Sequence, residues 1–111
     1  MSNSGNGLKN EAIREIAASA LTATYQNLGS PTEHRAFIVT VMNDTNGDVY
    51  LRRLSDSSVG NSKRIAGQSG RISDAKTNDA VEQAGTQFQV MWAGAAPGVP
   101  AGNFWVEVEY V

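Results

Sequence analysis

The sequence lacks cysteine altogether and has a single histidine, His34, among its 111 residues. Without cysteine the chain can form neither a disulfide framework nor a thiolate zinc site, and this fits assembly in a reducing cytoplasm. One imidazole alone also excludes metal sites that need two histidines. No apolar run approaches the roughly 20 residues of a membrane-spanning helix, and residues 1–10 have no apolar core of a signal peptide. We therefore expect a protein that is soluble when made, has no membrane partner and is not exported by a standard route.

A strong excess of either charge is missing as well, since nine basic and eleven acidic residues give a net charge of −2. A dedicated nucleic-acid binder needs a cationic surplus, so we expect no direct binding to nucleic acid. Six of the nine basic residues nevertheless lie between positions 52 and 76, and every charge after Lys76 is negative. The basic set is typical of a solvated face or, as a second interpretation, of an interface to an acidic neighbour. The interface candidates are Arg52, Arg53, Arg64 and Arg71, with Glu107 and Glu109 on the acidic side.

The end of the chain has a clear strand pattern. Phe88, Val90 and Trp92 occupy every second position of one segment, and from Phe104 to Val111 aromatic and β-branched residues alternate with more polar ones. A period of two is that of a pleated strand with one apolar face. The pattern predicts a closing β-hairpin, with the chain terminus held inside a sheet.

A second hairpin is predicted in the first half of the chain. Residues 36–42 (AFIVTVM) and 49–51 (VYL) are rich in β-branched and aromatic residues. Asn46-Gly47 lies between them and is typical of a type I′ turn or a bulged hairpin loop. Because both faces of the 36–42 strand are partly apolar, we expect it to be central in its sheet.

The N-terminal segment is less regular. Residues 1–7 are small and polar and predict a mobile tail, and apolar residues at helical spacing after Asn10 favour a short helix over 10–17. From Ala18 the alternation changes to that of a strand that ends at the turn 28–31. We therefore divide the chain into a flexible arm, residues 1–17, and a domain, residues 18–111.

Shorter strands are predicted around 64–66 and 71–75. The total is about six or seven short strands separated by turn residues. That pattern predicts an all-β fold, a small antiparallel β-sandwich or barrel with a short N-terminal arm or helix.

Residues suited to catalysis are few. His34 stands at the entrance to a predicted strand, where a surface position is far commoner than a catalytic base. The chain has no nucleophile elbow and no phosphate-binding glycine loop. Glu107 and Glu109 share one face of a strand, roughly 7 Å apart, as solvated surface residues commonly do. We expect no enzymatic activity, no catalytic residue, no metal and no cofactor.

An uncharged loop, residues 94–102, joins the two closing strands and contains Pro97, Val99 and Pro100. Two interpretations have equal weight: a hairpin loop stiffened by proline, or a tip that inserts into a groove on a partner. Trp92 and Trp105 lie beside it in the sequence, and tryptophan is favoured at interfaces. Pro97, Val99 and Pro100 therefore join the interface candidates.

Several segments between Ala18 and Val111 resemble small virion proteins of tailed bacteriophages. The resemblance implies a β-sandwich component of the head, neck or tail, present in many copies in a symmetric assembly and without catalytic residues. The sequence departs from the family at Arg52–Ser55, where the family has a more neutral turn. The segments that carry the resemblance are Tyr25–Gly29, Arg35–Val39, Asn43–Leu51, Ala66–Ser69, Gly85–Val90 and Gly102–Val111.

The main hypothesis is thus a structural component of a tailed-phage virion, made in the host cytoplasm. It would self-associate through edge strands and complementary charged faces and contact capsid, portal or tail subunits. The alternative is a carbohydrate- or receptor-binding module that uses Trp92, Trp105 and Tyr110 as a sugar platform. A third hypothesis, an enzyme, requires a cleft with paired acid and base groups, and mutation of His34 and Glu107 would test it.

Overall fold

The structure is a computed structural model that describes residues 9–57, 62–68, 70–75 and 82–110. For Phe37 and residues 70–75 it describes the backbone alone. The predicted mobile tail, residues 1–7, lies outside the described residues.

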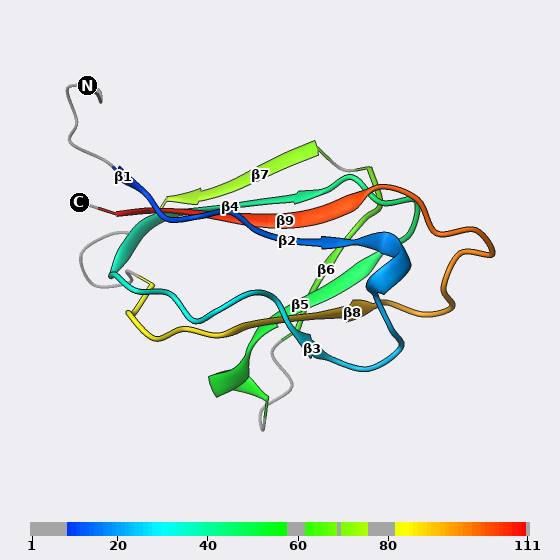
Figure 1. The fold of residues 1–111 in the computed structure, drawn as a ribbon, viewed down its shortest axis with the longest axis horizontal. Coiled ribbons are helices and arrows are strands. Elements are labelled where there is room, and N and C mark those ends of the chain that lie inside the picture. Colours follow the sequence, from blue (N-terminus) through cyan, green and yellow to red (C-terminus); the bar gives the residue numbers. More distant parts are fainter. Residues whose placement is uncertain (1–8, 58–61, 69, 76–81, 111) are drawn as a thin grey trace.

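Two antiparallel sheets pack face to face (Figure 1). Sheet A has the order β1/β2-β9-β4-β7, and sheet B has the order β3-β8-β5-β6. The strands of sheet A are β1 (Lys9–Asn10), β2 (Arg14–Ala17), β4 (Ala36–Asn43), β7 (Gly70–Ala75) and β9 (Asn103–Tyr110). Those of sheet B are β3 (Gln26–Asn27), β5 (Val49–Arg53), β6 (Lys63–Ile65) and β8 (Phe88–Trp92), and two 3₁₀ turns are η1 (Ala18–Ala20) and η2 (Leu54–Asp56).

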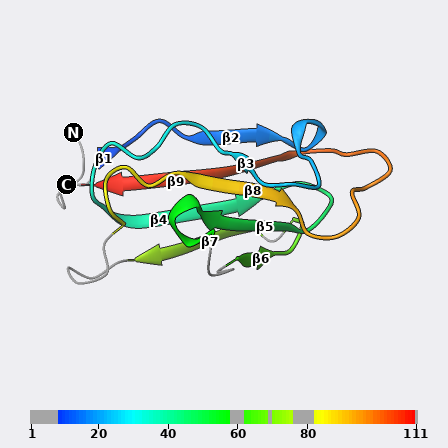
Figure 2. The same ribbon diagram turned by 90° about the horizontal axis from the view of Figure 1, so that it is seen from below.

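The connections give the chain the topology of a jelly roll. From β2 onward the chain passes from one sheet to the other at every connection except that between β5 and β6, which are neighbours in sheet B. Figure 2 shows the result, with β8 lying over β9 and β5 lying over β4. Because β1 and β2 occupy the same edge position beside β9, each sheet has four strand positions, and sheets linked in this order form the double-sheet jelly roll. The predicted all-β sandwich is therefore confirmed.

The core lies between the sheets and comes from alternate residues of the long strands. In β8, Phe88, Val90 and Trp92 are buried, as the period of two predicts, and in β9 Phe104 and Val106 are fully buried. The indole Nε1 of Trp92 donates to the carbonyl of Leu21 at 3.1 Å, which satisfies its one polar group inside the core. The predicted inward face of both strands is confirmed.

Both predicted hairpins are wrong. β4 pairs with β9 and β7, whereas β5 pairs with β8 and β6, so β4 and β5 belong to different sheets. β8 and β9 are separated in the same way. In each case the loop carries the chain across the sandwich, and the two strands lie face to face. The expected central position of the 36–42 strand is confirmed, because β4 lies between β9 and β7.

The loop after β4 shows why no hairpin forms there. Asn43 and Thr45 are fully buried, and the Asn43 amide donates to the carbonyls of Gly47 and Ile65, both at 3.0 Å. The Asn43 carbonyl oxygen accepts from the Thr45 hydroxyl at 2.6 Å. Among the described residues, neither Asn46 nor Gly47 has the positive φ that a type I′ turn requires. The buried side chains of Asn43 and Thr45 therefore make the hydrogen bonds to this loop that an adjacent strand would make in a hairpin.

The N-terminal helix predicted over 10–17 is also wrong. β1 and β2 pair with β9 in turn and form one edge of sheet A, with Arg14 opposite Val106. A strand fits this segment because β9 has an open edge there, and Ile13, which helical spacing placed on an apolar face, is 54% exposed. The expected strand after Ala18 is reduced to η1 and the two residues of β3. The short strands predicted around 64–66 and 71–75 are confirmed as β6 and β7.

Candidate interaction surfaces

The uncharged loop after β8 is held firmly by the loop after β4. Asn46 donates from its side-chain amide to the Val99 carbonyl at 2.9 Å and accepts from the Ala101 N–H at 3.0 Å. Its backbone N–H bonds the Ala101 carbonyl at 3.2 Å. Pro97 and Pro100 are half-buried, whereas Val99 is 82% exposed. The hydrogen bonds agree with the interpretation as a fixed loop, and Val99 is its exposed large apolar side chain. Insertion of the tip into a partner stays a prediction.

The outer face of sheet B carries a ladder of planar side chains. The guanidinium of Arg52 lies 3.7 Å from the ring centroid of Tyr25, and its Nε donates to the Gln89 side-chain oxygen at 3.0 Å. Gln89 in turn donates to the Asn27 side chain at 2.9 Å. The Tyr25 hydroxyl hydrogen-bonds to Ser62. Arg52 is therefore fixed by two neutral partners, Gln89 on β8 and Tyr25 in the loop before β3.

Arg64 extends this face across β6. It lies 5.8 Å from the ring centroid of Tyr50 and contacts Asp48 through Nε and a terminal nitrogen, at 3.2 and 2.9 Å. The N–H of Gly67 donates to the same carboxylate at 3.0 Å. These hydrogen bonds, from Gly67 first and Arg64 second, hold the pKa of Asp48 below its ordinary value. Asp48 therefore stays charged and compensates Arg64.

Arg53 does not belong to the outer face. It makes a two-pronged contact with Glu82, at 2.6 Å from Nε and 2.5 Å from a terminal nitrogen, and lies 3.7 Å from Asp56. Glu82 is buried, and the hydrogen bond to it raises the pKa of Arg53. This interface candidate thus has a role inside the chain. For Arg71, only the backbone position in β7, opposite Met42, is described.

The outer face of sheet A is acidic where its side chains are described. Glu107 and Glu109 of β9 are half-buried on this face, and Glu15 of β2 is exposed opposite Trp105. Met42 pairs with Trp105 on the other side of β9, and both are half-buried. The two glutamates thus share a face, as the sequence predicted, next to an apolar pair.

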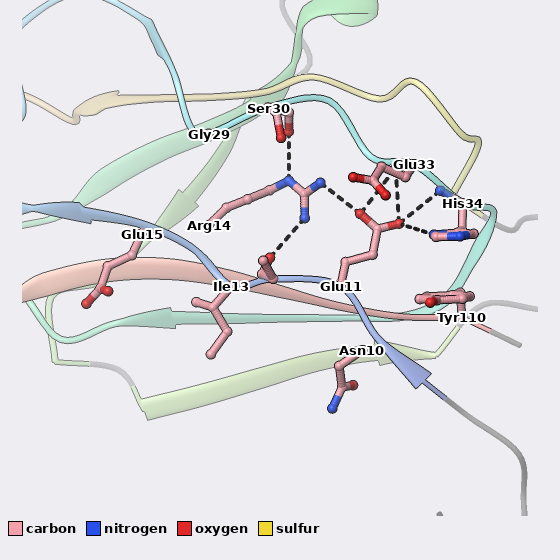
Figure 3. Close-up of a pocket in the computed structure, with 11 residues that line it drawn as sticks. Asn10, Glu11, Ile13, Arg14, Glu15, Gly29, Ser30, Glu33, His34 and Tyr110 are labelled. Atoms are coloured by element: carbon pink, nitrogen blue, oxygen red, sulfur yellow. Dashed lines mark hydrogen bonds and ion pairs between the residues drawn. The ribbon is translucent and has the colours of Figure 1, made fainter.

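A buried carboxylate fastens the N-terminal segment to the loop between β3 and β4 (Figure 3). Glu11 lies between β1 and β2 with a side chain 5% exposed, and accepts from Arg14 at 2.8 Å and from His34 Nδ1 at 3.1 Å. The backbone N–H groups of Glu33 and His34 add contacts of 2.9 to 3.2 Å. Burial raises the pKa of Glu11, but these hydrogen bonds outweigh it and hold the pKa below the ordinary value.

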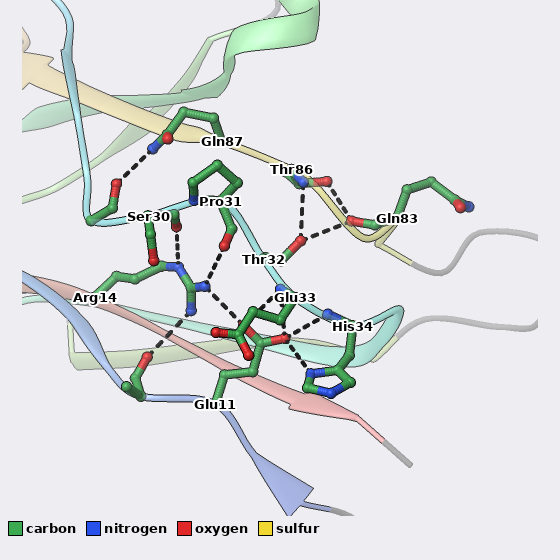
Figure 4. Close-up of polar contacts among 12 residues, drawn as sticks. Glu11, Arg14, Ser30, Pro31, Thr32, Glu33, His34, Gln83, Thr86 and Gln87 are labelled. Carbon is green, nitrogen blue, oxygen red and sulfur yellow. Dashed lines mark hydrogen bonds and ion pairs between the residues drawn. The ribbon is translucent and has the colours of Figure 1, made fainter.

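The same loop is tied to the segment before β8 (Figure 4). Arg14 donates to the carbonyls of Ser30 and Pro31 at 2.8 and 3.1 Å, and the Thr32 hydroxyl donates to the Gln83 carbonyl at 2.9 Å. The Thr86 N–H donates back to Thr32 at 3.0 Å. Three stretches distant in sequence are therefore joined at this end of the sandwich.

A hollow of about 480 Å³ adjoins the Glu11 cluster, but the polar groups of that cluster contact one another within the chain. His34 stacks on Tyr110 with 3.7 Å between ring centroids, so its ring is fixed on one face and by Glu11 at Nδ1. Glu107 lies on the outer face of sheet A, away from this hollow. Among the described residues, His34 and Glu107 therefore do not share a cleft.

The sugar platform proposed from the sequence is also absent. Trp92 is 2% exposed in the core, Trp105 lies on the outer face of sheet A, and Tyr110 stacks on His34. The aromatic surface that exists, with Tyr25 and Tyr50, was missed. Tyr50 and Arg52 share a face by alternation, which the sequence shows, but Tyr25 precedes β3 and has no such signal.

Comparison of the chain with protein-family models, curated proteins and solved structures finds no match. Within the described residues no group of three or more His, Cys, Asp or Glu side chains is placed to hold a metal ion. The described helices also include none long and apolar enough to cross a membrane.

Proposed function

We propose that this chain is a non-enzymatic structural component of a tailed-phage virion, assembled in multiple copies on the capsid or at the head–tail neck or tail. The observation that carries the proposal is the jelly-roll sandwich with a fixed, uncharged tip. Jelly rolls serve in viral capsid proteins, although the same fold also serves in lectins, so the topology supports the proposal without deciding it. The resemblance to tailed-phage virion proteins favours the first use.

The tip has the properties of a contact to another virion protein. Three hydrogen bonds to Asn46 fix its backbone before any partner arrives, so little conformational entropy is lost on binding. Val99 offers an exposed apolar side chain with no charge to desolvate. A groove on a capsid, portal or tail subunit is the partner that this chemistry fits.

The test compares Val99→Asp with Val99→Thr in the tagged chain during a phage infection. We expect the aspartate variant to fall at least tenfold in gradient-purified particles relative to wild type, because its charge would be buried, while the threonine variant falls less. Equal melting temperatures would show that both variants fold. Incorporation of Val99→Asp at the wild-type level would contradict a role for the tip, and absence of the wild-type chain from particles would contradict the proposed function.

A second candidate function, binding of an acidic saccharide, is favoured by one observation. Tyr25, Arg52 and Gln89 place an aromatic ring, a cation and an amide on one outer face. A glycan array tests it directly. Binding that is lost in Arg52→Ala and kept in Trp105→Ala would support this function, and no binding to any glycan would exclude it.

A further inference from the structure

We infer that the outer face of sheet B in one copy docks on the outer face of sheet A in a second copy, so that copies associate head to tail. This inference rests on the proposed assembly in multiple copies and identifies the surfaces that would carry it. The basic face is defined by Tyr25, Tyr50, Arg52 and Arg64, and the acidic face by Glu15, Trp105, Glu109 and Met42.

Charge complementarity selects the occupant. Arg52 has aromatic and amide partners but no carboxylate within 4 Å among the described residues. Glu15 and Glu109 likewise have no cationic partner there. Glu107 makes a contact within its own chain, so it is not counted. A second copy supplies to each face the charge that it lacks.

Arg52 is already arranged to receive a carboxylate. Stacking on Tyr25 fixes the plane of its guanidinium, and the contact with Gln89 uses only Nε. The two terminal nitrogens remain for a bidentate contact, which is the geometry that arginine offers to carboxylates. Because the side chain is held before contact, binding costs less rotamer entropy.

Each face also carries apolar area beside its charge. Trp105 and Met42 are opposite one another in sheet A, and Tyr50 and Met91 are opposite one another in sheet B, all half-buried. Aromatic, methionine and arginine side chains are enriched in protein interfaces. Docking would remove this area from water around the charged contacts.

The arrangement of the faces decides the symmetry. Sheets A and B form opposite layers of the sandwich (Figure 1), so their outer faces point in opposite directions. A two-fold contact of either face with itself would not bring the uncompensated Arg52 to the uncompensated Glu15 and Glu109. A contact of sheet A in one copy on sheet B in the next is heterologous. It leaves one outer face of each kind unpaired at the ends of the assembly, so further copies can add until the assembly closes into a ring or grows as a stack.

Charge reversal tests the inference, with analytical ultracentrifugation and light scattering at low salt as the readout. We expect Arg52→Glu, and separately the Glu15→Lys/Glu109→Lys variant, to raise the apparent dissociation constant of self-association at least tenfold. Arg35→Glu and Glu33→Lys, which change exposed charges outside both faces, are the matched controls and should associate as wild type. Circular dichroism melting checks the fold of each variant.

Mixing the two reversed variants gives the decisive arm. In each variant alone, the contact between copies brings like charges together. In an equimolar mixture, a contact between one variant and the other again joins opposite charges, so the apparent dissociation constant should return to within about threefold of wild type. A mixture that stays monomeric would overturn the inference, as would a wild-type mass of 11.8 kDa at every concentration up to the millimolar range.

Two further outcomes separate the alternatives. If Arg52→Glu abolishes glycan binding while the acidic-face variant associates as wild type, the basic face takes a saccharide and the inference is overturned. If the chain is monomeric in solution yet present in purified particles, the inference fails and the proposed function stands.

Discussion

The two ends of the sandwich are held together by different chemistry. At the end with the loops after β4 and β8, the buried contacts are uncharged and come from Asn43 and Thr45. The contacts of Asn46 and the Asp48–Arg64 ion pair lie nearer the surface at the same end. At the opposite end, Glu11 with Arg14 and Glu82 with Arg53 are ionic. The buried network of Asn43 and Thr45 should therefore contribute equally at neutral and acidic pH, whereas Glu11, whose pKa is lowered, should lose its contribution as it protonates.

The largest expected effect is at Gly102, in the uncharged end. A Cβ there would lie 1.9 Å from the Asp44 carbonyl oxygen, and φ is +87°. We expect Gly102→Ala to lower the free energy of unfolding by about 3 kcal/mol or more, measured by urea denaturation. Gly94→Ala is the matched control, because φ is +96° and nothing lies within 4 Å of the added carbon. A loss as small as that of Gly94→Ala would contradict the close approach of the two loops.

Asn43→Ala should come next. It removes the amide that donates to the Gly47 and Ile65 carbonyls and the side-chain oxygen that accepts from the Thr45 N–H and hydroxyl, which we expect to cost about 3 kcal/mol in the free energy of unfolding. The loss should be equal at pH 7 and pH 4, because no titrating group is involved. Asn46→Ala, at an exposed position, should cost about 1 kcal/mol and serves as the control. A clear pH dependence of the Asn43→Ala loss would break the contrast between the ends.

Glu11→Gln should have a smaller effect, and one that depends on pH. The pKa of Glu11 is lowered in the folded chain from an ordinary value of 4.5. Its contribution is therefore complete above pH 4.5 and is lost as the pH falls through the folded pKa. We expect about 2 kcal/mol at pH 7 and a shrinking difference from wild type below pH 4.5, by urea denaturation at each pH. Glu33→Gln, next to the cluster but exposed, should match wild type throughout, and a constant Glu11→Gln deficit would contradict the ionic assignment.

The sequence predicted which faces of the strands are buried but not which strands are neighbours. Alternation along 88–92 identifies the inward side chains of β8, because pleating alone decides it. Whether the next strand lies beside it or across the core depends on the loop. At Asn46-Gly47 the turn chemistry indicated a hairpin, yet the buried Asn43 and Thr45 side chains bind the loop backbone instead. Such a network is invisible until Ile65 is placed beside it.

The candidate surfaces were predictable to a similar degree. The sequence shows that basic and acidic residues are separated along the chain. In the structure, this separation places Arg52 on the outer face of sheet B and Glu109 on the outer face of sheet A. The prediction of an interface role failed for Arg53, because this side chain at the end of β5 points toward Glu82. Tyr25 was missed because its contact with Arg52 joins a loop to a strand 27 positions later, which no periodicity records.

The copy number of the chain in gradient-purified phage particles tests the central claim most directly. Quantitative mass spectrometry against the major capsid protein measures it. The proposed function predicts several copies per particle in a fixed ratio that is unchanged between preparations. Absence of the chain, or trace amounts that vary from one preparation to the next, would contradict it.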